Sequence, residues 1–291
     1  MNDKIKDNTL GSLARYFHDV LDPIYLDKGE LKAIKRLLFE SLFGLHPAAL
    51  EIRKSETVSE SEILKFHFAV KKLRAGEPIQ YVLGHTEFLD LKIGVSPAVL
   101  IPRPETEELV RFAVREITPG SRVLDIGTGS GCIALGIKKM QPEAQVMACD
   151  VSEEALKVAK RNAEANDLSV DFFRMDILHP LENLDAFDVI ISNPPYVLEK
   201  DKLEMETHVL DYEPGLALFV PDENPLIFYQ AIAKFAQKNL KAGGKLFFEC
   251  HRDFAQAIAD YLKSSGFQDV AIHKDIFGEE RFLSANSNFN S

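Results

Sequence analysis

The sequence Asn193-Pro194-Pro195-Tyr196 contains the residues best suited by type and spacing to carry out chemistry. It follows an apolar run at residues 187–192 that predicts a buried strand. Open parallel sheets bind ligands just beyond the carboxyl ends of their strands. Two successive prolines fix the backbone and remove two N–H donors, so the carbonyl oxygens remain as acceptors in a rigid frame. The loop is therefore predicted to hold a flat group that carries N–H donors.

Such a loop suits methyl transfer to an amide or aryl amine nitrogen. The lone pair of this nitrogen is delocalised, so rate must come from alignment and from fixed dipoles that stabilise the developing positive charge. The Asn193 side-chain oxygen and the Pro194 carbonyl can each accept one hydrogen bond from the NH₂ group, and Tyr196 can stack on the flat group. We predict Asn193, Pro194 and Tyr196 as catalytic residues, with Pro195 completing the substrate frame. An ordinary Asn-Pro turn is the competing interpretation, and core or lid packing stays open for Tyr196.

A glycine-rich turn predicts where a cofactor binds. The stretch from Val123 to Leu135 runs from a strand through glycines into a helix, where backbone amides can approach a ligand closely. A dinucleotide fingerprint would want Gly or Ala where the chain has Cys132, and the alternate glycines favour S-adenosylmethionine over NAD. The predicted cofactor contacts are Asp125, Gly127, Thr128, Gly129, Ser130 and Gly131. A tight turn without a ligand is the alternative.

Two acids follow at the ends of later strands. Asp150 lies 23 residues after Gly127, where an acid can accept hydrogen bonds from both ribose hydroxyls. Asp176 ends the next strand, and its carboxylate or the neighbouring backbone could meet the adenine amine while Ile177 packs on the ring. For each acid, a helix N-cap or a solvated strand end is the competing interpretation.

The elements that must position these residues can be read from hydrophobic periodicity. Apolar runs near Val123, Val146, Phe172, Val189 and Leu246 alternate with helical stretches, which predicts βαβ units on a parallel sheet. Residues 1–77 instead show helical periods, with N-caps at Thr9, Asp27 and Ser59. Residues 81–84 and 88–95 suggest short extended segments with glycine turns. We therefore predict a helical domain over 1–77, a β-hairpin linker over 78–100 and an α/β catalytic domain over 101–291.

Composition narrows the function classes. The net charge is −11, and residues 1–80 hold 13 basic against 12 acidic side chains, so the acidic excess lies in the α/β region. That region is a poor candidate for non-specific nucleic-acid binding. Three cysteines without a C-x-x-C pair suggest neither disulfides nor zinc, and eight histidines show no paired ligand spacing, so no metal is expected. With no leader and no long apolar run, a cytoplasmic protein is expected.

The order of the glycine loop, Asp150 and Asn193-Pro194-Pro195-Tyr196 resembles amino methyltransferases that act on adenine or glutamine nitrogen. A longer stretch resembles the bacterial release factor glutamine methyltransferases more specifically. It reads Ser96-Pro97-Ala98-Val99-Leu100-Ile101-Pro102-Arg103-Pro104-Glu105-Thr106-Glu107, preceded by Glu77-Pro78-Ile79-Gln80-Tyr81 and Gly84. Glu213-Pro214, Ala217-Leu218 and the set Asp275, Gly278 and Arg281 extend the resemblance over nearly the whole chain.

This resemblance implies a seven-stranded Rossmann-like methyltransferase domain behind a small helical domain. It implies methylation of the glutamine amide in the Gly-Gly-Gln motif of class one peptide chain release factors, which modulates translation termination and yields S-adenosylhomocysteine. The release factor would be the protein partner, with neither nucleic acid nor membrane. Asn193 would touch both cofactor and substrate, and Arg103, Glu105 and Thr106 would line the site rim. A proline-stiffened loop that caps a helix at Thr106 is the competing interpretation of that segment.

Two other functions compete with this one. An adenine methyltransferase acting on DNA or RNA would use the same loop on a flipped base, but the charge and the lack of a basic recognition region argue against it. A catalytically silent cofactor-binding adaptor is disfavoured by the intact Asn193 and Pro194. The chain departs from its relatives at Ile177, where some carry an aromatic, and at Cys250-His251-Arg252. The long loop over residues 197–225 is expected to gate the substrate.

Overall fold

The chain divides into two compact units. The computed structural model describes residues 5–182, 184–205 and 207–289. One unit, called the helical unit here, comprises Met1–Gly84 and Thr207–Tyr212; the other, called the sheet unit, comprises His85–Glu206 and Glu213–Ser291. The predicted boundary after residue 77 falls within the helical unit. A short segment from the long loop after residue 196 also belongs to that unit, which the sequence did not indicate.

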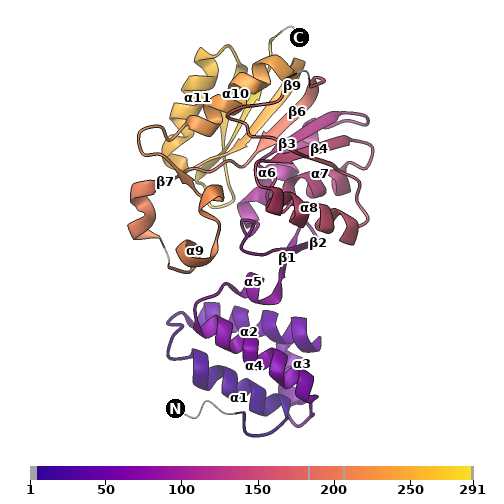
Figure 1. Cartoon of the computed structure of the whole chain (residues 1–291), viewed down its shortest axis with the longest axis vertical. Helices are drawn as coiled ribbons and strands as arrows, with labels where there is room; N and C mark the ends of the chain where they lie inside the picture. Colours follow the sequence, from indigo (N-terminus) through magenta and orange to yellow (C-terminus); the bar gives the residue numbers. More distant parts are fainter. Residues whose placement is uncertain (1–4, 183, 206, 290–291) are drawn as a thin grey trace. The chain divides into compact units, whose positions relative to one another are not determined.

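The start of the chain folds into helices of the helical unit (Figure 1), and side-chain caps mark where four of them begin. They are α1 (Leu10–Leu21), α2 (Lys28–Phe43), α3 (Pro47–Ile52), α4 (Glu60–Arg74) and α5 (Ile79–Leu83), joined by α9 (Thr207–Tyr212). Thr9 and Asp27 accept hydrogen bonds from the first turns of α1 and α2, and Ser59 with Glu62 forms a complete capping box. The inward stripes build one apolar core that includes Phe17, Leu38 and Phe66. The three predicted N-caps are therefore confirmed.

The predicted linker over residues 78–100 differs in part from its expected form. Residues 81–84, expected to be extended, belong to helix α5 and its C-cap, so this expectation was wrong. The hairpin itself consists of β1 (His85–Phe88) and β2 (Leu91–Gly94), paired antiparallel. Leu89 and Asp90 form its turn with positive φ angles of 49° and 55°, the geometry of a type I′ turn without glycine. The hairpin belongs to the sheet unit.

A seven-stranded sheet forms the centre of the sheet unit. Its strands are β3 (Arg122–Ile126), β4 (Gln145–Asp150), β5 (Asp171–Arg174), β6 (Phe187–Ser192), β9 (Leu240–Glu249), β10 (Gln268–Lys274) and β11 (Glu280–Asn286). They lie in the order β10-β11-β9-β6-β3-β4-β5. The five strands β9, β6, β3, β4 and β5 are parallel, while β11 runs antiparallel to both of its neighbours, β9 and the edge strand β10. The predicted seven-stranded Rossmann-like fold is thus confirmed.

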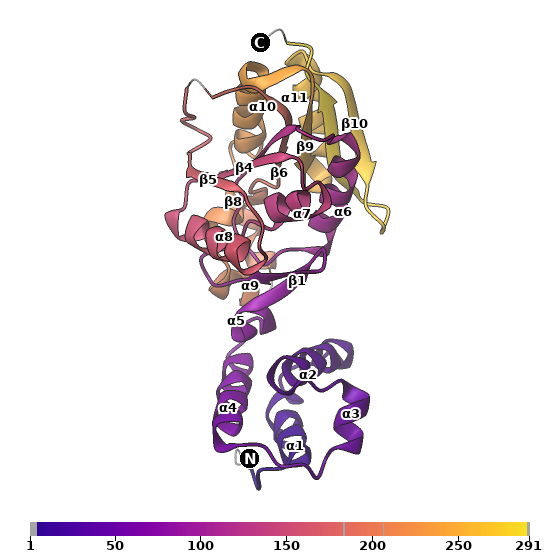
Figure 2. The same ribbon diagram turned by 90° about the vertical axis from the view of Figure 1, so that its right-hand side faces the viewer.

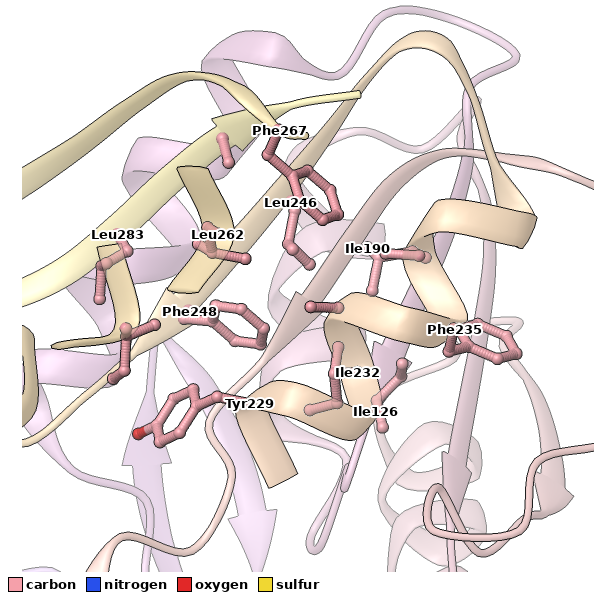
Figure 3. Close-up of a cluster of buried hydrophobic side chains, with 14 of the residues drawn as sticks. Ile126, Ile190, Tyr229, Ile232, Phe235, Leu246, Phe248, Leu262, Phe267 and Leu283 are labelled. Carbon is pink, nitrogen blue, oxygen red and sulfur yellow. The ribbon is translucent and has the colours of Figure 1, made fainter. Parts of the chain in front are cut away.

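Helices cover both faces of this sheet (Figures 1 and 2). One face carries α10 (Ile227–Asn239) and α11 (Ala255–Ser264), the other α6 (Pro104–Ala113), α7 (Cys132–Met140) and α8 (Glu153–Ala165). Figure 3 shows the core beneath α10 and α11, where Tyr229 and Ile232 meet Phe248 and Leu283 from the strands. Short 3₁₀ turns complete the unit: η1 (Val114–Glu116), η2 (Glu199–Glu204), η3 (Gly215–Ala217) and η4 (Arg252–Phe254).

The long loop after residue 196 contains structure of its own. Strand β7 (Val197–Leu198) pairs in parallel with β8 (Phe219–Val220), and η2, α9 and η3 lie between them. The pairing of β7 with β8 therefore brings the two ends of the loop together. Within the described ranges, no helix has the length and apolar character needed to cross a membrane.

Candidate active site

A cavity of about 360 Å³ opens at the carboxyl ends of the parallel strands. The loops after β3, β4, β5 and β6 contribute to its lining, as sheets of this topology require. Among the residues predicted from the sequence, twelve line the cavity: Arg103, Thr106, Gly127, Thr128, Gly129, Ser130, Asp150, Asp176, Ile177, Asn193, Pro194 and Pro195. Asp125, Gly131, Glu105 and Tyr196 are not among its lining residues.

The glycine loop approaches the cavity with its backbone. Gly127, Gly129 and Gly131 have positive φ angles of 74°, 53° and 84°, which L side chains rarely adopt. A Cβ at Gly127 or Gly129 would meet no protein atom within 4 Å, so the space beside these two residues is open to a ligand. At Gly131 a Cβ would lie 3.1 Å from the Cβ of Ala159 on α8. Gly131 therefore permits close helix packing, while the other two glycines leave room.

Asp150 ends β4 at the rim of the cavity. Its Oδ2 accepts a hydrogen bond from the backbone N–H of Gly129 at 2.9 Å, and its Oδ1 accepts one from Ser152 at 2.9 Å. Burial raises the pKa of this carboxyl, and the backbone donors oppose the rise. A carboxylate has about four acceptor positions, so both oxygens keep capacity for further donors such as a vicinal diol. The Asp150 carboxylate is thus fixed in place beside the glycine loop.

Asp125 lies beneath the glycine loop. It is fully buried, and the Thr128 hydroxyl donates to its Oδ2 at 2.6 Å. Its Oδ1 has no hydrogen-bond partner among the described residues. Burial raises the pKa of Asp125 to about 7, although the Thr128 hydrogen bond opposes the rise. Asp125 therefore supports Thr128, which itself lines the cavity.

Asp176 and Ile177 follow β5 and contribute differently. Ile177 packs against the core while lining the cavity. The Asp176 carboxylate accepts from the backbone N–H of Leu178 at 2.9 Å and bonds the His179 ring at 3.0 Å, and the hydrogen bond to His179 is the main reason its pKa is lowered. The turn after β5 thus already uses this carboxylate, which favours the backbone here as the group that meets a ligand.

The loop after β6 holds Asn193 from behind. The Ser192 hydroxyl donates to the Ile126 carbonyl at 2.7 Å, which ties the end of β6 to β3. The Asn193 Nδ2 donates to the Thr106 hydroxyl at 3.3 Å. With its NH₂ group turned to Thr106, the side-chain oxygen of Asn193 is left for another donor. Pro194 is buried, and the rings of Pro194 and Pro195 fix the φ angles of these two residues.

Tyr196 has surroundings other than those its predicted stacking role suggests. The ring is partly buried against the core below α10 and α11 and lies 6.0 Å from the His251 ring. Burial raises the pKa of its hydroxyl, and the nearby Glu249 acts in the same direction. The interpretation as a packing residue accounts for these contacts.

The Arg103 segment is bound by an acid from the long loop. The Arg103 guanidinium donates to Glu213 at 2.6 Å, and the backbone N–H of Ile101 donates to the same carboxylate at 3.2 Å. Glu213 is 5% exposed, so its charge is held by these two donors. The motif Glu213-Pro214 therefore fastens the chain before α6 to the end of the long loop.

Thr106 lines the cavity, as expected of a rim residue, whereas the expectation that it caps a helix is wrong. Helix α6 begins at Pro104 with Arg103 in the cap position, which places Thr106 within the first turn. Thr106 is buried at 2% exposure, and its hydroxyl donates to Glu249 at 2.7 Å. A threonine and a glutamate 143 positions apart give no local sequence signal of this bond.

Asn162 is a further residue that sequence reasoning missed. This side chain is buried on α8 and donates to the carbonyls of Gly94 and Ser130 at 2.9 and 2.8 Å, while its oxygen accepts from Gly94 N–H at 2.7 Å. A polar residue on the apolar stripe of α8 was the available signal. Asn162 joins the β1–β2 hairpin to the glycine loop.

Known protein families match both parts of the chain. The family described as methyltransferase small domain matches residues 107–211, and the one described as PrmC N-terminal domain matches residues 13–84. Among solved structures, a methyltransferase from Pyrococcus furiosus has a TM-score of 0.51 at 24% identity, covering 68% of this chain and 90% of its own. That likeness supports the fold.

Curated relatives extend the match over most of the chain. A release factor glutamine methyltransferase from Bacteroides thetaiotaomicron is 42% identical over 95% of this chain and 100% of its own length. Proteins of the same name from Flavobacterium psychrophilum and Lactococcus lactis are 37% and 41% identical, covering 89% and 79% of this chain and 93% and 84% of their own. Together with the cavity and the Asn193 loop, these matches show that the chain belongs to the release factor glutamine methyltransferase family.

Proposed function

We propose that this protein transfers a methyl group from S-adenosylmethionine to the side-chain amide nitrogen of the glutamine in the Gly-Gly-Gln motif of class one peptide chain release factors, and so modulates translation termination. The proposal rests on the Asn193 side chain. This side chain lines the cavity, and its Nδ2 donates a hydrogen bond to the Thr106 hydroxyl. Its oxygen is thus available to an NH₂ group. The shared name of the curated relatives supports the choice of substrate.

The cavity suits the cofactor that methyltransferase families use. Open space beside Gly127 and Gly129 admits a ligand to the backbone, and Asp150 offers a fixed carboxylate at the rim where a ribose would bind. Thr128 and Ser130 complete the loop, with Asp125 and Gly131 supporting it from below. Ile177 supplies an aliphatic surface on which the adenine ring of the cofactor would pack. When bound, S-adenosylmethionine supplies an activated methyl group on a sulfonium.

Residues of the chain would align the glutamine amide. The Asn193 Oδ1 and the Pro194 carbonyl would accept hydrogen bonds from its NH₂ group and hold the nitrogen in position to receive the methyl group. Positive charge grows on that nitrogen during transfer, so both acceptors bind the transition state more tightly than the ground state. The amide nitrogen would gain the methyl group as the S–C bond of the sulfonium breaks, which leaves S-adenosylhomocysteine. The nitrogen would then release one proton, made acidic by the new bond, to solvent. Arg103 and Glu105 would contact the protein substrate, and Pro195 would complete the frame. Tyr196 would support this frame through its packing on the core.

The proposed partner is a protein, and the proposed place of action is the cytoplasm. The experiment is transfer of labelled methyl from S-adenosylmethionine to a purified class one release factor, beside its Gln→Ala variant and duplex DNA. We expect label in the glutamine-bearing factor alone. Asn193→Ala should lower kcat by about 100-fold, the size of effect seen when one fixed polar contact to a transition state is removed.

A matched control separates this loss from general damage. The Asn166 side-chain NH₂ group donates hydrogen bonds to the backbone carbonyls of Lys92 and Asn162, and Asn166 does not line the cavity. Asn166→Ala should therefore keep kcat within about twofold of the wild-type value. Label in DNA would indicate an adenine methyltransferase, and label in neither would indicate a silent cofactor-binding protein. Either result would overturn the proposed function.

A further inference from the structure

Glu249 is a buried acid that is linked to Asn193 through Thr106 and that the proposed mechanism does not use. Glu249 ends β9, the strand next to β6, and is 1% exposed. Its Oε2 accepts the hydroxyl proton of Thr106 at 2.7 Å, and the Thr106 oxygen accepts from the Asn193 Nδ2 at 3.3 Å. Three polar side chains from β9, α6 and the loop after β6 therefore form one chain of hydrogen bonds that ends at the cavity.

The direction of each hydrogen bond in this chain is fixed by Glu249. An ionised carboxylate can accept hydrogen bonds but cannot donate them. The Thr106 hydroxyl must then donate its single proton to Glu249, so toward Asn193 it can only accept. Asn193 must therefore present its NH₂ group to Thr106 and its oxygen to the cavity. Because the two ends of an amide are nearly equal in size, packing alone would not select this orientation.

The opposite orientation would be unproductive. An Asn193 side chain turned by 180° would direct its NH₂ group at the NH₂ group of the acceptor glutamine, and two donors cannot form a hydrogen bond. The same contact would place positive hydrogens beside a nitrogen that becomes positive during transfer. The amide orientation of Asn193 thus decides whether the loop after β6 aligns the substrate or repels it.

The charges around Glu249 bear on its ionisation. Burial raises the pKa of Glu249 to about 7, and the charge of Glu105 on α6 acts in the same direction. The hydrogen bond from Thr106, the charge of Arg281 on β11 and, to a smaller extent, the nearby Asn193 amide oppose the rise. From α10, the Tyr229 hydroxyl donates to the Glu249 backbone carbonyl at 3.1 Å. Arg281 lies 3.6 Å from Asp275, so the motif Asp275-x-x-Gly278-x-x-Arg281 places a positive charge near the buried acid.

We propose that Glu249, acting through the Thr106 hydroxyl, is a positioning residue that sets the amide orientation of Asn193 for methyl transfer to a planar nitrogen. This inference rests on the proposed function. Glu249 does not line the cavity; Thr106 does, and in this role both residues act through Asn193. Ionised Glu249 supports the productive orientation, and protonated Glu249 can donate to Thr106 and so releases the constraint.

The first test exchanges Thr106 for isosteric and conservative residues. Thr106→Val keeps the volume and removes the hydroxyl, so kcat should fall about 10- to 100-fold while the KM for the release factor and the Kd for S-adenosylmethionine stay within about threefold. Thr106→Ser restores the hydroxyl and should recover most of the rate. Thr118→Val, which removes a hydroxyl bonded to Ser121 elsewhere in the unit, should leave kcat unchanged. Equal rates for Thr106→Val and the wild type would overturn the proposal.

The second test is the pH profile of kcat. The wild-type rate should fall as pH drops through about 7, because protonation of Glu249 removes the acceptor that orients Thr106. Glu249→Gln should have a lower rate with this acidic limb abolished, whereas Arg281→Met should move the limb to higher pH. Asp125 also has a pKa near 7, and a limb that persists unchanged in Glu249→Gln would assign it to Asp125 and contradict the proposal. Circular dichroism and cofactor binding establish that each variant is folded.

A third measurement does not depend on activity. The side-chain NH₂ resonance of Asn193, identified by its loss in Asn193→Ala, should exchange with solvent at least about 10-fold more slowly in the wild type and Thr106→Ser than in Thr106→Val. If the wild type transfers no label to a release factor, the proposed function fails while this exchange still decides the orientation. Equal exchange in all three proteins would overturn the positioning role even if methylation is observed.

Discussion

Asp150 illustrates how a single side chain can serve the fold and the ligand together. Both oxygens are already bonded to backbone N–H groups of Gly129 and Ser152, which fixes the carboxylate at the cavity rim. Asp150→Asn keeps the shape but loses the charge and part of the acceptor capacity. We expect S-adenosylmethionine binding to weaken about 10- to 100-fold, because hydrogen bonds to charged groups contribute about 1.5–3 kcal/mol. Titration calorimetry measures this, and an unchanged Kd would remove Asp150 from the cofactor site.

Asp125 should leave a signature in the pH dependence of stability. Its pKa is about 7 in the folded protein and near 3.8 when unfolded, so between these values the folded state holds a proton that the unfolded state has released. The contribution of Asp125 to the free energy of unfolding therefore decreases as pH rises from about 4 to 7. Asp125→Asn removes this dependence. Urea unfolding at pH 5, 6 and 7 should show the variant gaining on the wild type by on the order of 1 kcal/mol per pH unit. A constant difference would contradict the raised pKa.

Gly131, in the turn between β3 and α7, is needed both for its positive φ angle and for the close approach of α8. Gly120, which lies before β3, shares only the positive φ angle and serves as the control. Gly131 and Gly120 have similar φ angles of 84° and 80°, but a Cβ at Gly131 would meet Ala159 while one at Gly120 would meet nothing within 4 Å. Gly120→Ala should cost about 1–2 kcal/mol from backbone strain alone. Gly131→Ala should cost about 1–3 kcal/mol more from overpacking against α8. Thermal denaturation of the two variants measures each loss of stability. Equal losses would show that α8 can move enough to accommodate the added methyl group.

Local signals allowed some elements to be predicted and hid others. The caps at Thr9, Asp27 and Ser59 and the strand before Asn193 were readable because the deciding atoms lie within four residues of one another. Helix α5 was missed because its five residues lie between Pro78 and Gly84, a setting equally typical of a short strand. Periodicity needs more than one turn of helix to distinguish the two.

The candidate site shows the same limit. The glycine loop, Asp150 and Asn193 could be predicted because their chemistry is written in short motifs at strand ends. The bond from Thr106 to Glu249 joins α6 to β9, and its residues become neighbours only after the sheet has formed. The contacts of Tyr196 likewise depend on how α10 and α11 pack. Sequence reasoning therefore found the groups around the cavity and missed the groups that hold them.

The composition of the helical unit leads to a prediction about the long loop. Helix α9 belongs to that unit, and the Tyr212 hydroxyl donates to the Ala75 carbonyl at 3.1 Å. Tyr212→Phe should weaken the attachment of α9 by about 0.5–1.5 kcal/mol, the net value of one hydrogen bond. Limited proteolysis should then cut within residues 199–212 several-fold faster than in the wild type. Identical cleavage rates would show that other contacts hold α9.

The division of the chain has a consequence for how such a protein can be rebuilt by recombination. The polypeptide passes between the two units at residues 84/85, 206/207 and 212/213. A unit encoded by one continuous stretch can be exchanged between relatives with a single junction. Here a chimera that takes only residues 1–84 from a relative keeps the recipient's own α9. That α9 must then pack on helices that come from the relative. Exchanges that carry both stretches should be tolerated, so the helical unit and the loop beyond β7 are expected to diverge together.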